Sequence, residues 1–276
     1  MPAAAAIVLG TDFSPGSRLA QARAVELSLR YRAALHVVHA EPRLPRALAR
    51  HFSAVAPGKP GAALDSLVGA LRDAGVDAHA HSTHAEPVEA LSARARALAA
   101  ELIVVGTRGG TVLSSMLGST AERLVGRGRQ RVLLVRRPNQ RAYRQVMIAA
   151  SEQSRLADQV AAARFVSPER PAVLHAYEAP FESSLTWHGA SASELRSYRN
   201  TAGREAELSM GKLMAAAGLE PSQLVLRQGA PTKLLERFDP DSLLVLSRGK
   251  SSARRLLFGS VTRAVVAHGR SDVLLV

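Results

Sequence analysis

The sequence contains an internal repeat, because short motifs of its first half recur in the same order in its second half. Four pairs carry the repeat: Ser17-Arg18-Leu19-Ala20 with Ser154-Arg155-Leu156-Ala157, Ala85-Glu86-Pro87 with Gly229-Ala230-Pro231, Leu117-Gly118-Ser119 with Phe258-Gly259-Ser260, and residues 132–135 with 273–276. The two motifs of each pair are 137 to 144 residues apart. A nearly constant offset over four motif pairs in the same order indicates a tandem duplication. We therefore predict two domains of one fold, residues 1–138 and 139–276.

Each half alternates apolar runs with helix-like segments. We expect strands at residues 7–10, 35–39, 76–82, 102–105 and 132–135, and again at 145–149, 172–176, 223–227, 243–246 and 273–276. We expect helices at residues 15–32, 62–74, 87–99 and 118–127, and again at 154–165, 191–217, 231–238 and 259–268. Strands that alternate with helices form a parallel sheet covered on both faces. The predicted fold class is α/β, with two tandem, doubly wound, five-stranded parallel-sheet domains.

Composition narrows the possible functions. The chain has no cysteine, which excludes disulfides, thiolate metal sites and a cysteine nucleophile and suits a reducing compartment. Its formal net charge is +13, but the arginines are spread along the chain. Their densest cluster, within residues 123–137, has no interleaved aromatic residue. Solvated arginines are therefore favoured over a nucleic-acid surface. With no targeting segment and no run of about 18 apolar residues, we expect a cytoplasmic protein without a membrane partner or a specific nucleic-acid partner.

Two segments at predicted strand ends could hold a phosphate-bearing ligand. In Gly10-Thr11-Asp12 the carboxylate can accept hydrogen bonds from a ribose or a base, or serve equally as a turn or helix-cap residue. Gly106-Thr107-Arg108-Gly109 follows another strand, and Gly118-Ser119-Thr120 opens the next helix. Glycines let a backbone approach a phosphate, and free N–H groups at a helix start bind anions. The sequence predicts an anion site at the carboxyl ends of these strands.

On these residues the chain resembles the universal stress proteins, in particular those with two domains in one polypeptide. Thr11-Asp12-Phe13-Ser14 matches the family's step after its first strand, and Ala121-Glu122-Arg123 matches a segment that often follows its glycine pattern. That ATP-binding pattern is Gly-x2-Gly-x9-Gly-(Ser/Thr); here eight residues separate Gly109 from Gly118. The resemblance implies domains similar to Rossmann folds and adenine-nucleotide hydrolases. It also implies an internal pseudo-dimer packed through the fifth strands, and such chains can pair further as homodimers.

The resemblance implies ATP, ADP or AMP as the ligand, with or without Mg²⁺. Thr11 and Asp12 would face the adenine and ribose, and Val38 or Ala40 would flank the base. The remaining positions would line the ribose-to-phosphate path or hold the phosphates: Gly106, Arg108, Gly109, Gly118, Ser119 and Thr120. No residue is evident as a general base for attack on a γ-phosphate. We therefore predict no catalytic residue and at most a slow ATPase.

The second half departs from this pattern. Aligning residues 146–148 on 7–9 puts Ser151 in place of Asp12, and Leu246-Ser247-Arg248-Gly249 in place of Gly106-Thr107-Arg108-Gly109. Arg248, Gly249, Gly259 and Ser260 could keep a residual phosphate site, because nine residues still separate the two glycines. We therefore expect a reduced or absent nucleotide site in residues 139–276.

His79, His81 and His84 form a histidine cluster in the sequence. His79 and His81 share one face of a predicted strand, a spacing that suits two ligands of Zn²⁺ or Ni²⁺. No carboxylate clearly completes such a site, so solvent-facing polar positions are the favoured interpretation and no metal is predicted. His36, His39 and His175 are expected to be packed rather than catalytic.

The leading hypothesis is a tandem universal stress protein that binds an adenine nucleotide in its first domain. It would act in the stress response through its ligand state or its protein partners. The alternative is a tandem scaffold without nucleotide that binds protein partners or a small apolar ligand. Trp187-His188-Gly189, in a long connection of the second half, could form the lip of such a site or an ordinary loop tip.

Overall fold

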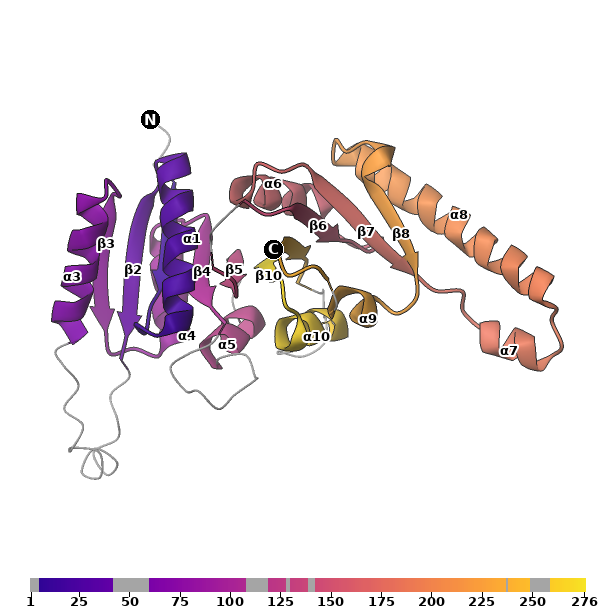
Figure 1. The fold of residues 1–276 in the computed structure, drawn as a ribbon, viewed down its shortest axis with the longest axis horizontal. Helices are drawn as coiled ribbons and strands as arrows, with labels where there is room; N and C mark the ends of the chain where they lie inside the picture. Colours follow the sequence, from indigo (N-terminus) through magenta and orange to yellow (C-terminus); the bar gives the residue numbers. More distant parts are fainter. Residues whose placement is uncertain are drawn as a thin grey trace, which may run out of the picture. The chain divides into compact units, whose positions relative to one another are not determined.

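The structure is a computed structural model that describes residues 5–41, 60–107, 119–127, 130–138, 142–236, 238–248 and 259–276. The chain divides into two compact units, Met1–Arg141 (unit 1) and Ala142–Val276 (unit 2). Neighbouring strands within each unit pair in parallel. Each unit is an α/β domain built on five parallel strands, which confirms the predicted fold class (Figure 1).

The strands of unit 1 lie in the order β3-β2-β1-β4-β5. Their bounds are β1 Ala6–Gly10, β2 Ala34–Ala40, β3 Ala78–Thr83, β4 Leu102–Gly106 and β5 Val132–Val135. The helices are α1 Pro15–Tyr31, α3 Pro60–Asp73, α4 Pro87–Ala97 and α5 Ser119–Arg127. The chain runs from β1 toward β3 on one side and from β4 to β5 on the other, so the strand order reverses between β1 and β4. In such sheets the crevice at the carboxyl ends of the reversing strands is the usual ligand site.

The core of unit 1 follows from its apolar runs. Residues at the centres of β1, β4 and β5 are fully buried, as expected for strands covered on both faces: Ile7, Leu9, Ile103, Leu133 and Leu134. The first helix begins where the sequence predicts, because Ser14 caps it by accepting a hydrogen bond from the Ser17 N–H at 3.3 Å and Pro15 takes the first helical position.

Unit 2 repeats the arrangement in the order β10-β9-β6-β7-β8. Its strands are β6 Gln145–Ala149, β7 Pro171–Tyr177, β8 Leu224–Gln228, β9 Ser242–Leu246 and β10 Asp272–Leu275. Its helices are α6 Leu156–Val166, α7 Glu182–Trp187, α8 Ala192–Ala216, α9 Pro231–Glu236 and α10 Ser260–His268, and a 3₁₀ turn lies at Pro221–Gln223. The predicted packing of the domains through their fifth strands stays a prediction.

Helix α7 was not predicted, and it lies with the first half of α8 away from the sheet of unit 2 (Figure 1). None of its six residues is buried. The buried residues of α8 are Ala206, Met210 and Met214, all in its second half. Within the described ranges, no helix combines the length and apolar character that a membrane span requires.

Candidate functional site

The turn between β1 and α1 lies at the carboxyl edge of unit 1. The Thr11 N–H donates to the Val38 carbonyl at 3.0 Å, which extends the β1–β2 ladder by one bond. Side chains satisfy the N–H groups of Phe13 and Ser14, since Phe13 N–H donates to Thr11 Oγ1 at 3.1 Å and Ser14 N–H donates to Asp12 Oδ1 at 3.0 Å. Phe13 has φ 60°, a left-handed conformation that is uncommon for a bulky residue.

Asp12 and Thr11 differ in what they leave open to a ligand. Thr11 is buried, and its hydroxyl both accepts from Phe13 and donates to Ser17 Oγ at 3.3 Å. Asp12 is exposed and uses Oδ1 within the turn, so the interpretation of Asp12 as a turn residue is correct. Its Oδ2 has no partner among the residues that the structure describes.

Gly106 ends β4 next to this turn. A Cβ atom built on Gly106 would lie 2.4 Å from the Gly16 carbonyl oxygen, so only glycine fits against the first turn of α1. The adjacent Thr107 is buried, and its N–H donates to the Val135 carbonyl at 3.2 Å. Because β1 pairs with β4, the structure brings Asp12 and Gly106 to neighbouring strand ends.

The other sequence-predicted residues are placed less completely. Arg108, Gly109 and Gly118 lie outside the described residues, as does the side chain of Ser119. Ser119 begins α5, and Thr120 is half-buried in its first turn. Val38 is 3% exposed, so its side chain is in the core. Ala40, the other position expected beside the base, is the last residue of β2.

Helices α4 and α5 are joined at this edge by an ion pair. Glu86 caps α4 by accepting from Val88 N–H at 3.2 Å, and its Oε1 lies 2.5 Å from Arg123 Nη1. Arg123 belongs to the Ala121-Glu122-Arg123 segment singled out in the sequence. Its described contact is therefore to a neighbouring helix, at a half-exposed site where an ion pair contributes little stability.

Sequence reasoning missed His39 as a part of this edge. Its Nδ1 lies 2.9 Å from the Thr11 carbonyl oxygen, and its ring centroid lies 4.8 Å from that of Phe13. His175 repeats the contact in unit 2, with Nδ1 2.9 Å from the Ala150 carbonyl oxygen. The sequence could have indicated this contact, because a histidine recurs near the end of the second strand in both halves.

The corresponding turn of unit 2 has no carboxylate at the position of Asp12. Ser151 stands there, and its N–H donates to Ser154 Oγ at 2.9 Å. Helix α6 begins only at Leu156, without a side-chain cap. Unit 2 therefore has a strand end equivalent to that of β1 but lacks an acidic side chain at the position of Asp12.

Strand pairing corrects the predicted alignment of the two halves by one residue at β4 and β9. Leu9 pairs with Val104, and its counterpart Ile148 pairs with Val245. Ser247, not Leu246, therefore corresponds to Gly106, and the prediction that a branched side chain replaces this glycine is wrong. The same register matches Arg248 to Thr107. The Arg248 N–H donates to the Val276 carbonyl at 3.0 Å, just as the Thr107 N–H donates to the Val135 carbonyl at 3.2 Å.

The predicted residual phosphate site of unit 2 is partly described. Burial lowers the pKa of Arg248 to about 10, because the charged guanidinium is desolvated. Gly259 is the exposed N-cap of α10, and Ser260 is the first residue of that helix. Gly249 lies outside the described residues. A phosphate role for these residues remains a prediction.

The histidine cluster differs from the one predicted. His36 pairs with His79 across β2 and β3, and its Nδ1 lies 2.9 Å from His81 Nε2. His84 lies beyond β3, where it contacts the Glu41 carbonyl oxygen at 3.1 Å. Desolvation lowers the pKa of His36, and desolvation together with Arg94 lowers that of His81 to about 4. Within the described ranges, no group of three or more histidine, aspartate or glutamate side chains is arranged to hold a metal ion.

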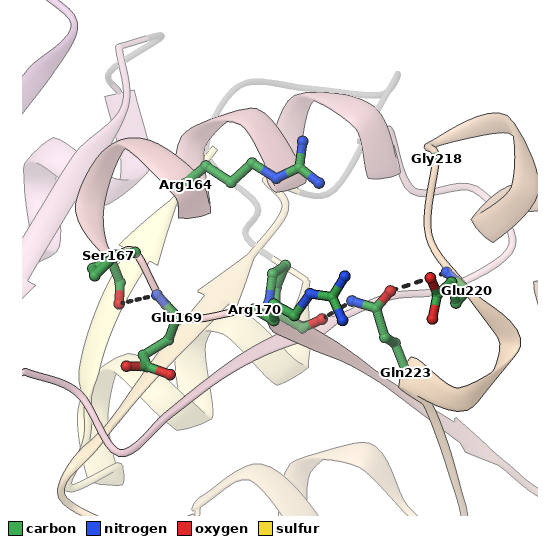
Figure 2. A pocket seen from close by; sticks show the side chains of 9 residues that line it. Arg164, Ser167, Glu169, Arg170, Gly218, Glu220 and Gln223 are labelled. Atoms are coloured by element: carbon green, nitrogen blue, oxygen red, sulfur yellow. Dashed lines mark hydrogen bonds between the residues drawn. The ribbon is translucent and has the colours of Figure 1, made fainter.

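A pocket of about 260 Å³ lies in unit 2 at the amino ends of β7 and β8 (Figure 2). Its lining residues are Arg164, Ser167, Pro168, Glu169, Arg170, Pro171, Gly218, Glu220 and Gln223. Gln223 Nε2 donates to the Pro171 carbonyl at 2.7 Å, and the Glu220 N–H donates to Gln223 Oε1 at 2.9 Å. Since ligands of such sheets bind at the carboxyl ends of strands, this pocket is distinct from the predicted site.

Comparisons with known proteins identify the family. The model of the universal stress protein family matches residues 5–136 and 142–276. A functionally unknown protein from Pseudomonas aeruginosa PAO1 aligns with 99% of this chain and 92% of its own, at 18% identity and a TM-score of 0.65. A universal stress protein from Archaeoglobus fulgidus DSM 4304 aligns with 98% and 97%, at 16% identity and a TM-score of 0.62. At these identities the two structures support the fold alone, and no curated protein is significantly similar. Because the family model matches both units, the chain belongs to the universal stress protein family, with two such domains in tandem.

Proposed function

We propose that the first domain, residues 1–138, binds ATP or a related adenine nucleotide at the carboxyl edge between β1 and β4. The second domain, residues 139–276, has a reduced nucleotide site or none. The protein then acts in the stress response through its ligand state or its partners, and turns ATP over slowly at most. A chain without cysteine suits a reducing compartment, so we assign it to the cytoplasm.

One observation carries this proposal: Asp12, in the turn after β1, and Gly106, the last residue of β4, lie beyond neighbouring strands at the point where the strand order reverses. Asp12 keeps Oδ2 open to a ligand while Oδ1 accepts from Ser14. A carboxylate oxygen accepts hydrogen bonds from a ribose hydroxyl or an adenine amine. Family membership supports the same interpretation, and Ser151 at the equivalent place in unit 2 supports a single adenosine site for each chain.

The phosphates would lie nearer α5. The first N–H groups of a helix have no partner within it and favour an anion. Ser119 and Thr120 supply two of these groups, and the Thr120 hydroxyl would add a donor. Mg²⁺, where present, would offset the charge of the phosphates. No described residue is evident as a general base for attack on a γ-phosphate, so we propose ligand binding and not turnover as the function.

Mass spectrometry of the gently denatured protein for co-purified ATP, ADP or AMP is the first test. Calorimetric titration with ATP should then give one site per chain. Asp12→Asn is the informative variant, because its amide oxygen can still accept from Ser14 N–H while the charge is lost. Asp12→Asn and Gly118→Val should each remove or strongly weaken binding, and Ser151→Ala should not. Two equal sites per chain, or unchanged binding in Asp12→Asn, would refute the proposal.

A tandem scaffold that binds protein partners without a nucleotide remains a second candidate function, because unit 2 exposes two aromatic side chains. Phe181 and Trp187, at the two ends of α7, are 79% and 88% exposed. The segment is tied to α8 by an ion pair between Glu182 and Arg199 and by a 2.6 Å hydrogen bond from Tyr198 to the Pro180 carbonyl. Exposed aromatic residues on an ordered segment are typical of contact surfaces. A stress phenotype that survives Asp12→Ala but is lost in Trp187→Ala would favour the scaffold.

A further inference from the structure

A histidine of β2 contacts the turn that carries Asp12. His39 Nδ1 lies 2.9 Å from the Thr11 carbonyl oxygen. A carbonyl oxygen can only accept, so Nδ1 must carry the proton and Nε2 is the unprotonated nitrogen of the neutral ring. The same ring lies against Phe13, with an angle of 42° between the ring planes. His39 therefore contacts the residues on both sides of Asp12.

The turn needs such support because of its conformation. Phe13 has φ 60°, which a side chain of this size adopts only where its surroundings impose it. The two hydrogen bonds inside the turn, to Thr11 Oγ1 and to Asp12 Oδ1, depend on the same backbone path. If the Thr11 carbonyl or the Phe13 ring shifts, Asp12 must shift with them. The direction of the Asp12 carboxylate is thus coupled to the position of the His39 ring.

Unit 2 contains the same histidine contact without the acidic residue. His175 Nδ1 lies 2.9 Å from the Ala150 carbonyl oxygen. Ser151 and Glu152 stand in the positions of Asp12 and Phe13. The histidine–carbonyl bond is therefore a shared feature of both domains, while the aromatic contact and a carboxylate at the position of Asp12 belong to the first. This difference supplies a matched control inside one chain.

We propose that His39 is a positioning residue for the nucleotide site of the first domain, an inference that rests on the proposed function. Its Nδ1–H bond to Thr11 and its contact with Phe13 keep the turn in the conformation that leaves Asp12 Oδ2 open to the ligand. His39 itself does not contact the nucleotide. His175 makes the equivalent bond next to a turn that has Ser151, and no carboxylate, at the position of Asp12.

Calorimetric titration of the full chain with ATP tests this role through three variants. In His39→Asn the side-chain amide can replace the Nδ1–H donor, whereas His39→Leu has no donor. Loss of one such hydrogen bond should weaken ATP binding about fivefold to tenfold in His39→Leu, with His39→Asn within about twofold of the unaltered protein. His175→Leu should leave ATP binding unchanged.

NMR adds a measurement that does not need the nucleotide. Proton–nitrogen spectra should show His39 protonated at Nδ1, and amide exchange of Phe13 and Ser14 should become faster in His39→Leu but not in His39→Asn. A proton on Nε2 alone, unchanged ATP affinity in His39→Leu, or equal losses in His39→Leu and His39→Asn would each overturn the inference. If the unaltered protein binds no ATP, the proposed function fails by itself. The exchange rates then decide whether His39 holds the turn.

Discussion

The Nδ1 atom of His36 and the Nε2 atom of His81 lie 2.9 Å apart, so one ring donates a hydrogen bond to the other. The acceptor nitrogen must be unprotonated for this bond to form. The ring of His79 stacks on that of His36, with the centroids 4.7 Å apart. Arg94 of α4 adds a positive charge that acts on both His36 and His81. Protonation of these rings therefore opposes the pairing of β2 with β3.

We predict that unit 1 loses stability as the pH falls from about 6.5 to about 4. The pKa of His81 is lowered from 6.5 to about 4, mainly by desolvation and then by Arg94. Between these values the unfolded chain binds a proton at His81 that the folded unit does not bind. The contribution of His81 is thus complete above pH 6.5 and is lost as the pH falls through this range. Thermal unfolding followed by circular dichroism at stepped pH measures the loss.

Two variants isolate the histidine contribution from other titrating groups. His81→Gln should show a shallower fall of the unfolding midpoint over this pH range than the unaltered protein. His84→Gln should retain the full slope, because His84 is exposed and lies outside the His36–His79–His81 group. Parallel curves for all three proteins would show that the cluster does not contribute to acid sensitivity.

Gly106→Ala should destabilise unit 1. The added Cβ would lie 2.4 Å from Gly16 O and 2.5 Å from Gly16 C, and both are backbone atoms that cannot rotate away. The first turn of α1 or the end of β4 must then move, at a cost on the order of 1–3 kcal/mol. Urea unfolding followed by circular dichroism measures the change in the free energy of unfolding.

Gly69→Ala is the matched control for this substitution. Gly69 lies within α3, and a Cβ there would have no atom within 4 Å. Alanine restricts the unfolded chain and favours the helix, so this variant should gain roughly 0.5–1 kcal/mol. No loss of stability in Gly106→Ala would contradict the close packing of α1 against β4, and a loss in Gly69→Ala would contradict the open space beside Gly69 in α3.

Tyr143→Phe should destabilise unit 2 more than Tyr198→Phe does. Tyr143 and Asp272 are both buried, and the phenol donates to Asp272 Oδ2 at 2.8 Å. Removing one partner of a buried hydrogen bond leaves the other without a partner for that bond, at a cost of about 1–3 kcal/mol. Tyr198 donates instead to the neutral Pro180 carbonyl at an exposed site. Equal changes in the unfolding free energy of the two variants would contradict this ranking.

The fold was predictable from sequence because the buried strands are short, continuous apolar runs. Residues 132–135 and 145–149 were expected as strands, and both have these bounds in the structure. Helix α7 was missed because its six residues show no apolar face and none of them is buried. A helix without a buried face leaves no periodic pattern in the sequence.

The site was harder to predict, because its contacts depend on register between strands. An alignment based on short glycine-containing motifs put Leu246 in place of Gly106, whereas the pairing of β6 with β9 puts Ser247 there. Histidines were grouped by closeness in the chain, which joined His84 to the cluster and left out His36. The pairing of His36 with His79 arises between strands more than 40 residues apart, a relation that sequence spacing does not contain.

The indole of Trp187 should be freely accessible in the folded protein. Trp187 is the single tryptophan of the chain and is 88% exposed, so its fluorescence reports on the end of α7 alone. Acrylamide should quench its emission with nearly the same efficiency before and after unfolding in urea, because folding buries little of the ring. Trp187→Phe supplies the fluorescence background, and its free energy of unfolding should stay within about 0.5 kcal/mol of the unaltered protein. Quenching that becomes efficient only after unfolding would mean that another surface covers the ring. A dilution series would then distinguish a second copy of the chain from a contact within it, because only the former releases the ring on dilution.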